Sequence, residues 1–338
     1  MNTPLRVGIV GLNNQGRDHV EASLHARGVT LTAICDREPS LLADVRSRLG
    51  PRDDIASFED FEALFASGTI DAAIVALPHH VHPAVVEAAG RHGIHLLKEK
   101  PLGRSLREGL SMAATMRRAG LVMHTGVQRR HHPTYVAMKE ALAGRIVRSG
   151  RVELWVQGGS RSARPASPEV WRADFDKAGG GVLIDLGYHG IDLAQFLFGP
   201  LELLACSLWG EAGPTPERTV ESQASVWALA GRTWLSFDFA RAAEKRERIE
   251  LDVDDERWIA DRARFVRVHP DGREEVVATA GTSWSEASVR QLESFAEAVR
   301  TGRASVETLD DQLPVLRFLG RCYGMQALEA FDGAGEVG

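Results

Sequence analysis

Cysteine is scarce in this chain. Its 338 residues include three cysteines, Cys35, Cys206 and Cys322, which lie far apart and form no Cys-x-x-Cys pair. Their odd number and wide spacing give no basis for a disulfide framework or a zinc site, and they are typical of a reducing compartment. Strand-like sequence begins by Arg6 and leaves no room for a secretory signal peptide. We therefore expect a cytoplasmic protein.

Long apolar runs and a strong excess of one charge are also missing. No apolar stretch approaches the roughly 20 residues of a membrane-spanning helix. The formal net charge of −6 argues against a general role on nucleic acid or at a membrane surface. No internal repeat or low-complexity linker interrupts the chain. Because 338 residues are too many for one small core, we expect two domains.

The N-terminal segment carries a pattern for holding a dinucleotide. Residues 6–16 form a short apolar run that breaks into a glycine-rich turn, and the next apolar run ends at Asp36. A buried strand, a tight turn, a helix N-terminus that favours anions and an acid after the second strand together predict this site. The usual glycines map to Gly11, Asn13 and Gly16. Since Asn tolerates positive φ, the turn can survive, and its side chain can donate to a pyrophosphate.

Asp36 also bears on the choice between NAD and NADP. Its carboxylate is placed to accept hydrogen bonds from both ribose hydroxyls, and its charge would repel a 2′-phosphate. Arg37 keeps NADP open, because a guanidinium can stack on adenine or bind that phosphate. We expect NAD, with NADP as the alternative.

Two folds follow one another along the chain. Up to residue 126, apolar strands at 6–11, 30–35, 71–76, 95–97 and 121–125 alternate with amphipathic segments, which predicts a parallel sheet covered on both faces. Residues 127–338 change to strictly alternating strands such as 233–240, with helices expected near 181–198, 285–301 and 310–331. We expect an α/β Rossmann domain over 1–126 and an α+β domain over 127–338 with a predominantly antiparallel, open-faced sheet. The uncovered face would need a partner, which favours a homo-oligomer.

One candidate chemical site follows two strands of the first domain. A strand ending at Pro78 leads into His79, His80 and His82, and the next strand ends in Lys98-Glu99-Lys100. Open α/β sheets bind ligands at this carboxyl edge, where a lysine can stabilise a developing alkoxide. The competing interpretation is a solvated charge cluster in a loop. These histidines could bind a metal, but their nearness to the expected nicotinamide position fits contacts with a substrate better.

The second candidate is the stretch from Gly179 to Asp192. If a helix begins near Gly181, Asp185 and His189 are four residues apart on one face. An acid beside a histidine raises its proton affinity and makes it a credible general base. A plain ion pair on a helix face is the alternative. Two possible ligands without a third marked by spacing do not predict a metal site.

These motifs together resemble the glucose–fructose oxidoreductase / inositol dehydrogenase family over essentially the whole chain. The residues that carry the resemblance are Gly11 to Gly16 with His19, Asp36, Pro78-His-His-Val-His, Glu99-Lys-Pro, Gly126-Val-Gln-Arg-Arg, Trp171-Arg172 and Gly179-Gly-Gly…Asp185…His189. The resemblance implies a Rossmann domain joined to an α+β domain, often in dimers or tetramers. It also implies NAD(P)-dependent oxidation of a secondary alcohol of a sugar or cyclitol, or the reverse reduction.

The resemblance also assigns roles to residues. Lys100 matches the catalytic lysine, and Asp185 with His189 matches the acid–histidine pair of the inositol dehydrogenase branch; Tyr188 is the alternative acid–base group. The candidate cofactor-binding residues are Gly11, Asn13, Asn14, Gln15, Gly16, Asp36, Arg37, Leu77, Pro78, His79, His82, Glu99, Lys100 and Gln128. The candidate substrate-binding residues are Lys100, Gln128, Arg129, Arg161, Trp171, Arg172, Asp185 and His189.

The functional hypothesis is a metal-free NAD-dependent dehydrogenase of a sugar, cyclitol or sugar acid. Several arginines would suit an anionic substrate, although most loop arginines are solvated or paired. One alternative is a lyase or glycosidase that retains NAD and oxidises a sugar only transiently. A second is a non-catalytic NAD sensor, against which the complete set of Lys100, Asp185 and His189 argues.

Overall fold

The computed structural model describes residues 3–157, 170–210, 213–214, 220–281, 284–302 and 308–324. They form two compact units. The first unit holds the chain up to Gly103, Glu108–Gln128 and Trp284–Gln312, and the second holds Arg104–Arg107, Arg129–Ser283 and the chain from Leu313. The chain thus passes from one unit to the other close to residue 126. The sequence alone did not anticipate its return to the first unit at Trp284.

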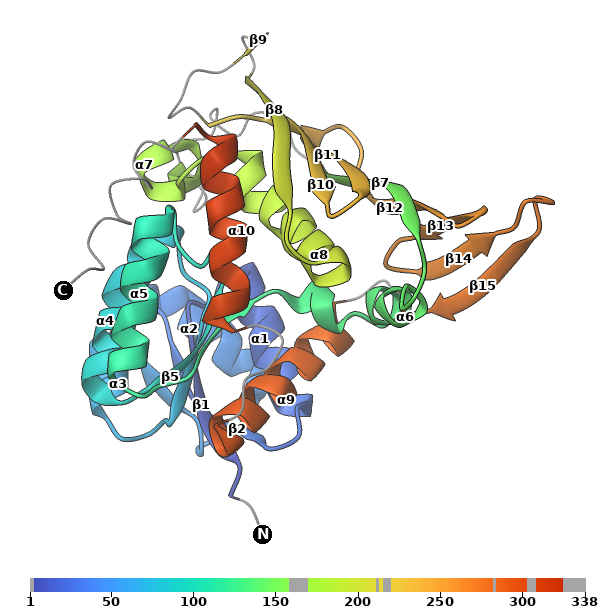
Figure 1. Cartoon of the computed structure of the whole chain (residues 1–338). Coiled ribbons are helices and arrows are strands. Elements are labelled where there is room, and N and C mark those ends of the chain that lie inside the picture. The colour runs from blue at the N-terminus through green and yellow to red at the C-terminus, as the bar shows by residue number, and fades with distance from the viewer. Residues whose placement is uncertain are drawn as a thin grey trace. The chain divides into compact units, whose positions relative to one another are not determined.

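The first unit is built on a parallel sheet. Its strands are β1 (Leu5–Val10), β2 (Val29–Cys35), β3 (Ala56–Phe58), β4 (Ala72–Val75), β5 (His95–Glu99) and β6 (Met123–Gly126), in the order β3-β2-β1-β4-β5-β6. All neighbours are parallel. The connecting helices are α1 (Asn14–His25), α2 (Pro39–Leu49), α3 (Phe61–Ala66), α4 (His82–His92) and α5 (Leu106–Arg118) (Figure 1). This confirms the Rossmann prediction, and the strand order reverses between β1 and β4, where such folds bind ligands.

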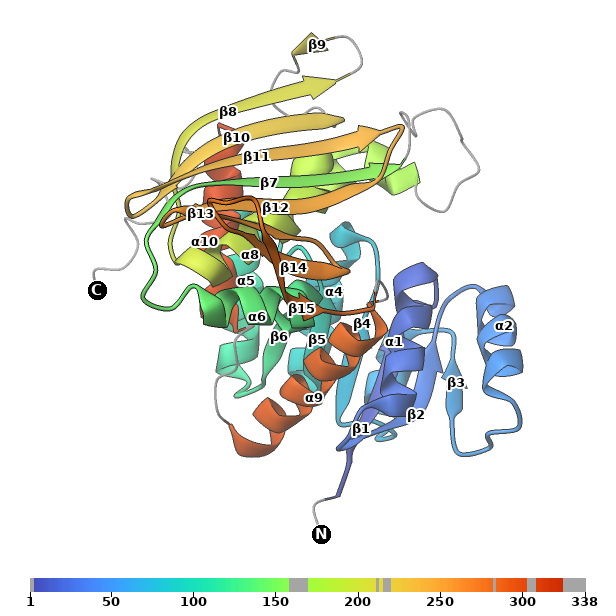
Figure 2. The ribbon, with the colours of Figure 1, turned by 90° about the vertical axis from the view of Figure 1, so that its right-hand side faces the viewer.

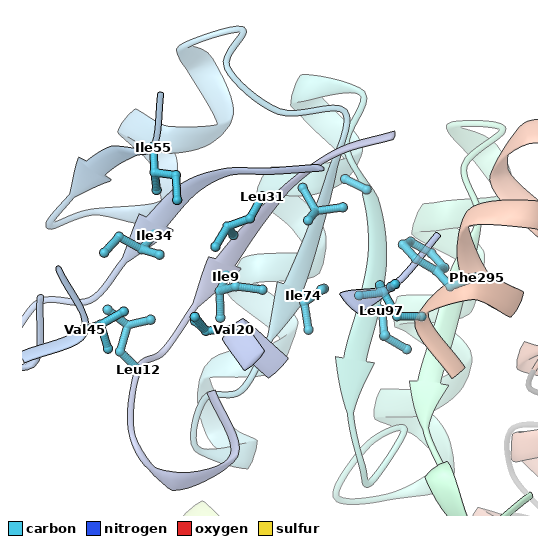
Figure 3. Close-up of a cluster of buried hydrophobic side chains, with 14 of the residues drawn as sticks. Ile9, Leu12, Val20, Leu31, Ile34, Val45, Ile55, Ile74, Leu97 and Phe295 are labelled. Atoms are coloured by element: carbon cyan, nitrogen blue, oxygen red, sulfur yellow. The ribbon is translucent and has the colours of Figure 1, made fainter. Parts of the chain in front are cut away.

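Helix α9 (Ser285–Thr301) completes the core of this unit from far along the chain. Its Phe295 is fully buried in a cluster with Ile9, Ile74 and Leu97 from β1, β4 and β5. Figure 3 shows the aromatic ring beside Leu97. The apolar residues that sequence periodicity assigned to the strands therefore form one core with this late helix.

The second unit is built on a nine-stranded sheet. Its strands are β7 (Val147–Gln157), β8 (Glu202–Gly210), β9 (Gly213–Pro214), β10 (Gln223–Ala230), β11 (Thr233–Ala242), β12 (Arg246–Val253), β13 (Glu256–Ala260), β14 (Arg264–Val268) and β15 (Glu274–Thr279). Their order is β15-β14-β13-β12-β7-β11-β10-β8-β9. Only β11 with β7 is a parallel pair among these strands; the others are antiparallel, as predicted.

The two faces of this sheet differ sharply. Leu235, Phe237 and Phe239 are buried on one face, as their alternation predicted. Helix α8 (Tyr188–Phe198) packs there, and Figure 2 shows it on one side of β10, β11, β7 and β12. On the opposite face Trp227 and Trp234 are 44% and 60% exposed. No helix of the described residues covers them.

Other helices of this unit are α6 (Pro133–Ala141), α7 (Phe175–Ala178) and α10 (Leu309–Cys322), the last of which begins in the first unit. The helix expected over 181–198 is a π-helical turn, η5 (Leu183–Gly187), that continues into α8. The helix expected over 310–331 ends at Cys322, and residues beyond 324 lie outside the described part. Among the helices described, none has the length and apolar character to cross a membrane.

Candidate functional site

The glycine-rich turn after β1 leaves no room for side chains at two positions. Gly11 has φ +91°, and a Cβ there would lie 2.9 Å from the carbonyl carbon of Ala76. A Cβ on Gly16 would lie 2.7 Å from the carbonyl carbon of Gly11. Asn13 instead has φ −76° and caps α1, its side-chain oxygen accepting from the Asn14 amide at 3.0 Å. Asn replaces glycine here without strain, because the positive φ falls on Gly11.

Asp36 lies at the carboxyl end of β2 and is bound to this turn. Its Oδ2 accepts from the Leu12 amide at 2.7 Å, and its Oδ1 accepts from the Glu38 amide at 3.0 Å. Each carboxylate oxygen has two lone pairs, so both can still accept from ribose hydroxyls. Arg37 beside it is exposed. The turn, which excludes side chains at Gly11 and Gly16, fits a dinucleotide together with the N-terminus of α1 and the acid at the end of β2.

The histidine segment after β4 is largely buried. Leu77 and Pro78 lead into the short helix η1 (His79–Val81), where His79 is buried and His80 is exposed. His82 is also buried, and its Nε2 donates to the Leu77 carbonyl at 2.9 Å. The described residues contain no group of three or more side chains placed to hold a metal ion.

The Glu99-Lys100 segment at the end of β5 is linked to α1. His19 Nε2 donates to Glu99 Oε1 at 2.8 Å, and both side chains are buried. Burial alone would raise the pKa of Glu99, but the His19 hydrogen bond and the nearby charges hold it below its ordinary value. A Cβ on Gly126 would lie 3.1 Å from the Glu99 carboxyl carbon. Glu99 is thus an ionised, enclosed carboxylate immediately before Lys100.

In the second unit, the glycine triplet is explained by three separate close approaches. Gly179 and Gly180 have φ of +87° and +151°. A Cβ on Gly179 would lie 2.7 Å from Arg104 Cβ, and one on Gly180 would lie 2.6 Å from Tyr323 Cζ. A Cβ on Gly181 would lie 2.8 Å from the carbonyl carbon of Glu221. Glycine at these three positions therefore lets Arg104, Tyr323 and Glu221 pack directly against the backbone.

Glu221 caps the start of the following helix from a distant part of the sequence. Its two carboxylate oxygens accept from the Gly181 amide at 2.9 Å and the Leu183 amide at 2.7 Å. The Tyr323 hydroxyl donates to the same carboxylate at 2.8 Å. Burial raises the pKa of Glu221 despite these hydrogen bonds. Neither Glu221 nor Tyr323 carries a sequence signal, because each contact joins segments far apart in the chain.

Asp185 lies in the π-helical turn between two guanidinium groups. Its Oδ2 is 2.9 Å from Arg241 Nη2 and 3.6 Å from Arg172 Nε. Arg172 in turn lies over the Trp171 ring, 4.3 Å from its centroid. His189 follows in α8 and is 8% exposed. Arg241, at the end of β11, is a residue that sequence reasoning missed, and it makes this cluster rich in positive charge.

The remaining candidates fall into several environments. Arg129 donates to Glu247 through two nitrogens at 3.2 and 3.1 Å, and the two side chains are 7% and 9% exposed. Gln128 Oε1 is buried and accepts no hydrogen bond from the part of the chain that the structure describes. Tyr188 is fully buried. Arg161 lies outside the described residues. Arg129 thus occupies a structural ion pair, whereas Gln128 retains a free acceptor.

Two family models match this chain. "Oxidoreductase family, NAD-binding Rossmann fold" matches residues 5–127, and "GFO/IDH/MocA C-terminal domain" matches residues 137–257. Inositol 2-dehydrogenase of Rhizobium meliloti is 25% identical over 92% of this chain and 94% of its own length. 1,5-Anhydro-D-fructose reductase of Ensifer adhaerens is 28% identical over 60% of each chain. The matches to two further relatives, a myo-inositol 2-dehydrogenase and a levoglucosan dehydrogenase, span 55% and 56% of those proteins.

Solved structures show the same fold. An oxidoreductase from Agrobacterium radiobacter, in complex with NAD+, L-tartaric acid and magnesium, superposes with a TM-score of 0.80 at 20% identity, covering 96% of this chain and 97% of its own. A 3-ketoreductase from Actinomadura kijaniata, in complex with TDP-benzene and NADP, gives 0.77 at 22% identity over 93% and 95%. At 20% and 22% identity, these similarities show a shared fold and no more.

Proposed function

The chain belongs to the GFO/IDH/MocA family of oxidoreductases, and we propose that it is a cytoplasmic NAD-dependent dehydrogenase of a secondary alcohol on a sugar, cyclitol or sugar acid. The observation that carries the proposal is the combination of two features: a turn that excludes side chains at Gly11 and Gly16, and a charged cluster around Asp185. The relatives, which include inositol and sugar dehydrogenases, support the substrate class.

We assign the proton-transfer chemistry to three residues. The ammonium of Lys100 stabilises the negative charge that develops on the substrate oxygen. His189 accepts the hydroxyl proton, and Asp185 supplies the negative charge that favours the imidazolium so formed. A bound nicotinamide supplies the hydride acceptor for the carbon that is oxidised. Arg172 and Arg241 both pair with Asp185, and their two positive charges against its single negative charge favour a substrate that carries a carboxylate.

NAD rather than NADP is proposed on the ground of Asp36. Its carboxylate, held by the Leu12 and Glu38 amides, would face a 2′-phosphate with a fixed negative charge. Arg37 is exposed and adjacent, so a direct comparison of the two cofactors decides the question. Tighter binding of NADPH than NADH would contradict the proposed role of Asp36.

The function is tested with a panel of cyclitols, aldoses and sugar acids, each followed by absorbance of the reduced cofactor. We expect NADH to accumulate with at least one member and sugar acids to be preferred over their neutral counterparts. Product formation without net NADH would instead identify the lyase or glycosidase alternative. Cofactor binding without any turnover or product would favour a sensor.

A homodimer or homotetramer is proposed through the open face of the second sheet. Trp227 and Trp234 border a hollow of about 240 Å³ on that face, together with Arg151 and Glu250. Exposed tryptophans beside charges of both signs suit a self-complementary interface. Light scattering tests this: wild type should be oligomeric, and Trp227→Glu with Trp234→Glu should reduce its mass.

A further inference from the structure

Lys98 is a lysine with no exposure to solvent. It lies in β5, between β4 and β6, two residues before Lys100. Its Nζ donates to the Glu99 carbonyl at 2.9 Å and to the Pro101 carbonyl at 2.6 Å. The third neighbour is His82 Nδ1 at 3.1 Å. The three hydrogens of an ammonium group therefore each have an acceptor.

These acceptors bracket one residue and join two loops. The Glu99 and Pro101 carbonyls lie on either side of Lys100, so one ammonium group restrains the backbone before and after it. His82 donates through Nε2 to the Leu77 carbonyl, which leaves Nδ1 as the acceptor for Lys98. Lys98 thereby connects the loop after β5 to the Leu77–His82 segment after β4. Both loops carry candidate cofactor contacts.

Burying the ammonium group of Lys98 in the sheet costs free energy, because the charge loses its hydration. Burial lowers the pKa of Lys98 to about 7, although Glu99 and Glu108 favour its charged form. An apolar side chain would fill a strand interior without this desolvation cost. What an apolar side chain lacks is the ability to bind two carbonyls and an imidazole at once. The arrangement is therefore suited to holding a particular loop geometry.

We propose that Lys98 is a positioning residue that holds Lys100 at its working place by binding the backbone on both sides of it. The inference rests on the proposed function, in which Lys100 stabilises charge on the substrate oxygen. Lys98 itself touches neither substrate nor cofactor in this assignment. It acts through the Glu99 and Pro101 carbonyls and through His82.

The test replaces Lys98 with Met, an unbranched side chain one heavy atom shorter than lysine, which removes all three donors. Lys139→Met is the matched control, because Lys139 also donates to two backbone carbonyls, those of Phe196 and Leu197, in the second unit. For each variant, kcat and KM are measured with the best substrate of the panel. The dissociation constant for NADH is measured by fluorescence without substrate, and Tm is recorded.

We expect Lys98→Met to lower kcat about 10- to 100-fold, the usual consequence of a catalytic group misplaced by a fraction of an ångström to 1 Å. KM for the substrate should stay within about three-fold, because the substrate still meets an intact Lys100. NADH should bind about three-fold more weakly or worse, since the Leu77–His82 segment loses a restraint. Lys139→Met should leave kcat within about two-fold, as expected for a contact made away from the reacting groups.

Unchanged kcat and NADH affinity in folded Lys98→Met would overturn the proposal. If Lys98→Met fails to fold, Lys98→Gln tests the proposal instead. Its shorter amide cannot reach both the Glu99 and the Pro101 carbonyl, so turnover should still be slower than in wild type. Unchanged turnover and NADH affinity in Lys98→Gln would again overturn the proposal. If the wild type oxidises no panel member, the proposed function fails by itself. The NADH dissociation constant then decides the role of Lys98: weaker binding supports it, and unchanged binding refutes it.

Discussion

Replacing Gly181 with Ala should destabilise the start of η5, the π-helical turn that contains Asp185. The added Cβ would lie 2.8 Å from the carbonyl carbon of Glu221. Carbon atoms normally approach to about 3.5–4.0 Å, so the backbone of one segment must move by roughly 1 Å. Because the obstacle is backbone, no rotamer change can relieve the overlap. The two segments must separate.

Separation breaks a set of hydrogen bonds around Glu221. Its carbonyl accepts from the Val182 amide at 2.9 Å, and its carboxylate accepts from Gly181 and Leu183 at 2.9 and 2.7 Å. Overpacking typically costs about 1–3 kcal/mol. Each weakened buried hydrogen bond adds about 1 kcal/mol. With three such hydrogen bonds, the expected loss is about 4–6 kcal/mol in the free energy of unfolding, or on the order of 10 °C in Tm for a unit of this size.

Gly231→Ala is the matched control. Gly231 lies in the same unit between β10 and β11, with φ +61° and no atom within 4 Å of an added Cβ. Alanine there meets backbone strain of about 1–2 kcal/mol but no overlap. Differential scanning calorimetry should therefore show a clearly smaller decrease in Tm than for Gly181→Ala. The NADH dissociation constant should stay unchanged in both variants, because the dinucleotide turn is in the other unit.

Similar Tm decreases in the two variants would refute the close-packing explanation of the triplet. Gly181 would then be required for another reason, such as contact with a ligand. That explanation predicts that Gly181→Ala loses turnover while its Tm falls no further than that of Gly231→Ala. Calorimetry and kinetics on the same preparations separate the two.

Four further predictions concern the cofactor and the charged groups. Asp36→Ser should weaken NADH binding and bring the NADH and NADPH dissociation constants closer together; an unchanged preference would show that Asp36 does not discriminate. Lys100→Met should lower kcat about 100-fold or more while Tm changes little, and an unchanged rate with every substrate would assign Lys100 to a solvated loop. Wild-type kcat should fall at low pH as His189 becomes protonated, and His189→Asn should lose about 10²–10⁴-fold; an active His189→Asn with an inactive Tyr188→Phe would make the tyrosine the acid–base group. Burial lowers the pKa of Lys98 to about 7, so the desolvation of its charge destabilises the folded protein fully below pH 7 and no longer does so once the pH reaches the pKa of lysine in the unfolded chain. As the pH rises from 7 to 10, wild type should therefore gain stability relative to Lys98→Met. Parallel curves of Tm against pH for the two proteins would contradict this.

Elements whose signals are local could be predicted from the sequence. The turn from Gly11 to Gly16, the helix after it and Asp36 all belong to one βαβ unit, so spacing was sufficient to place them. Alternation likewise assigned Leu235 and Phe239 to the buried face of β11. These predictions succeed because a strand or a tight turn is decided by residues a few positions apart.

The distant groups that surround the candidate residues could not be predicted from the sequence, because they depend on how the chain packs. Periodicity placed Asp185 on a helix, yet Arg241 reaches it only because β11 ends beside the π-helical turn. For the same reason Glu221 became a helix cap, and Lys98 came to lie against His82. Such contacts join segments that only packing brings together, and a charged side chain has the same local signal whether it faces water or a buried carbonyl. Sequence could therefore single out Asp185 and Lys100 as candidates, whereas the ion pairs of Asp185 and the contact of Lys98 with His82 were visible only in the fold.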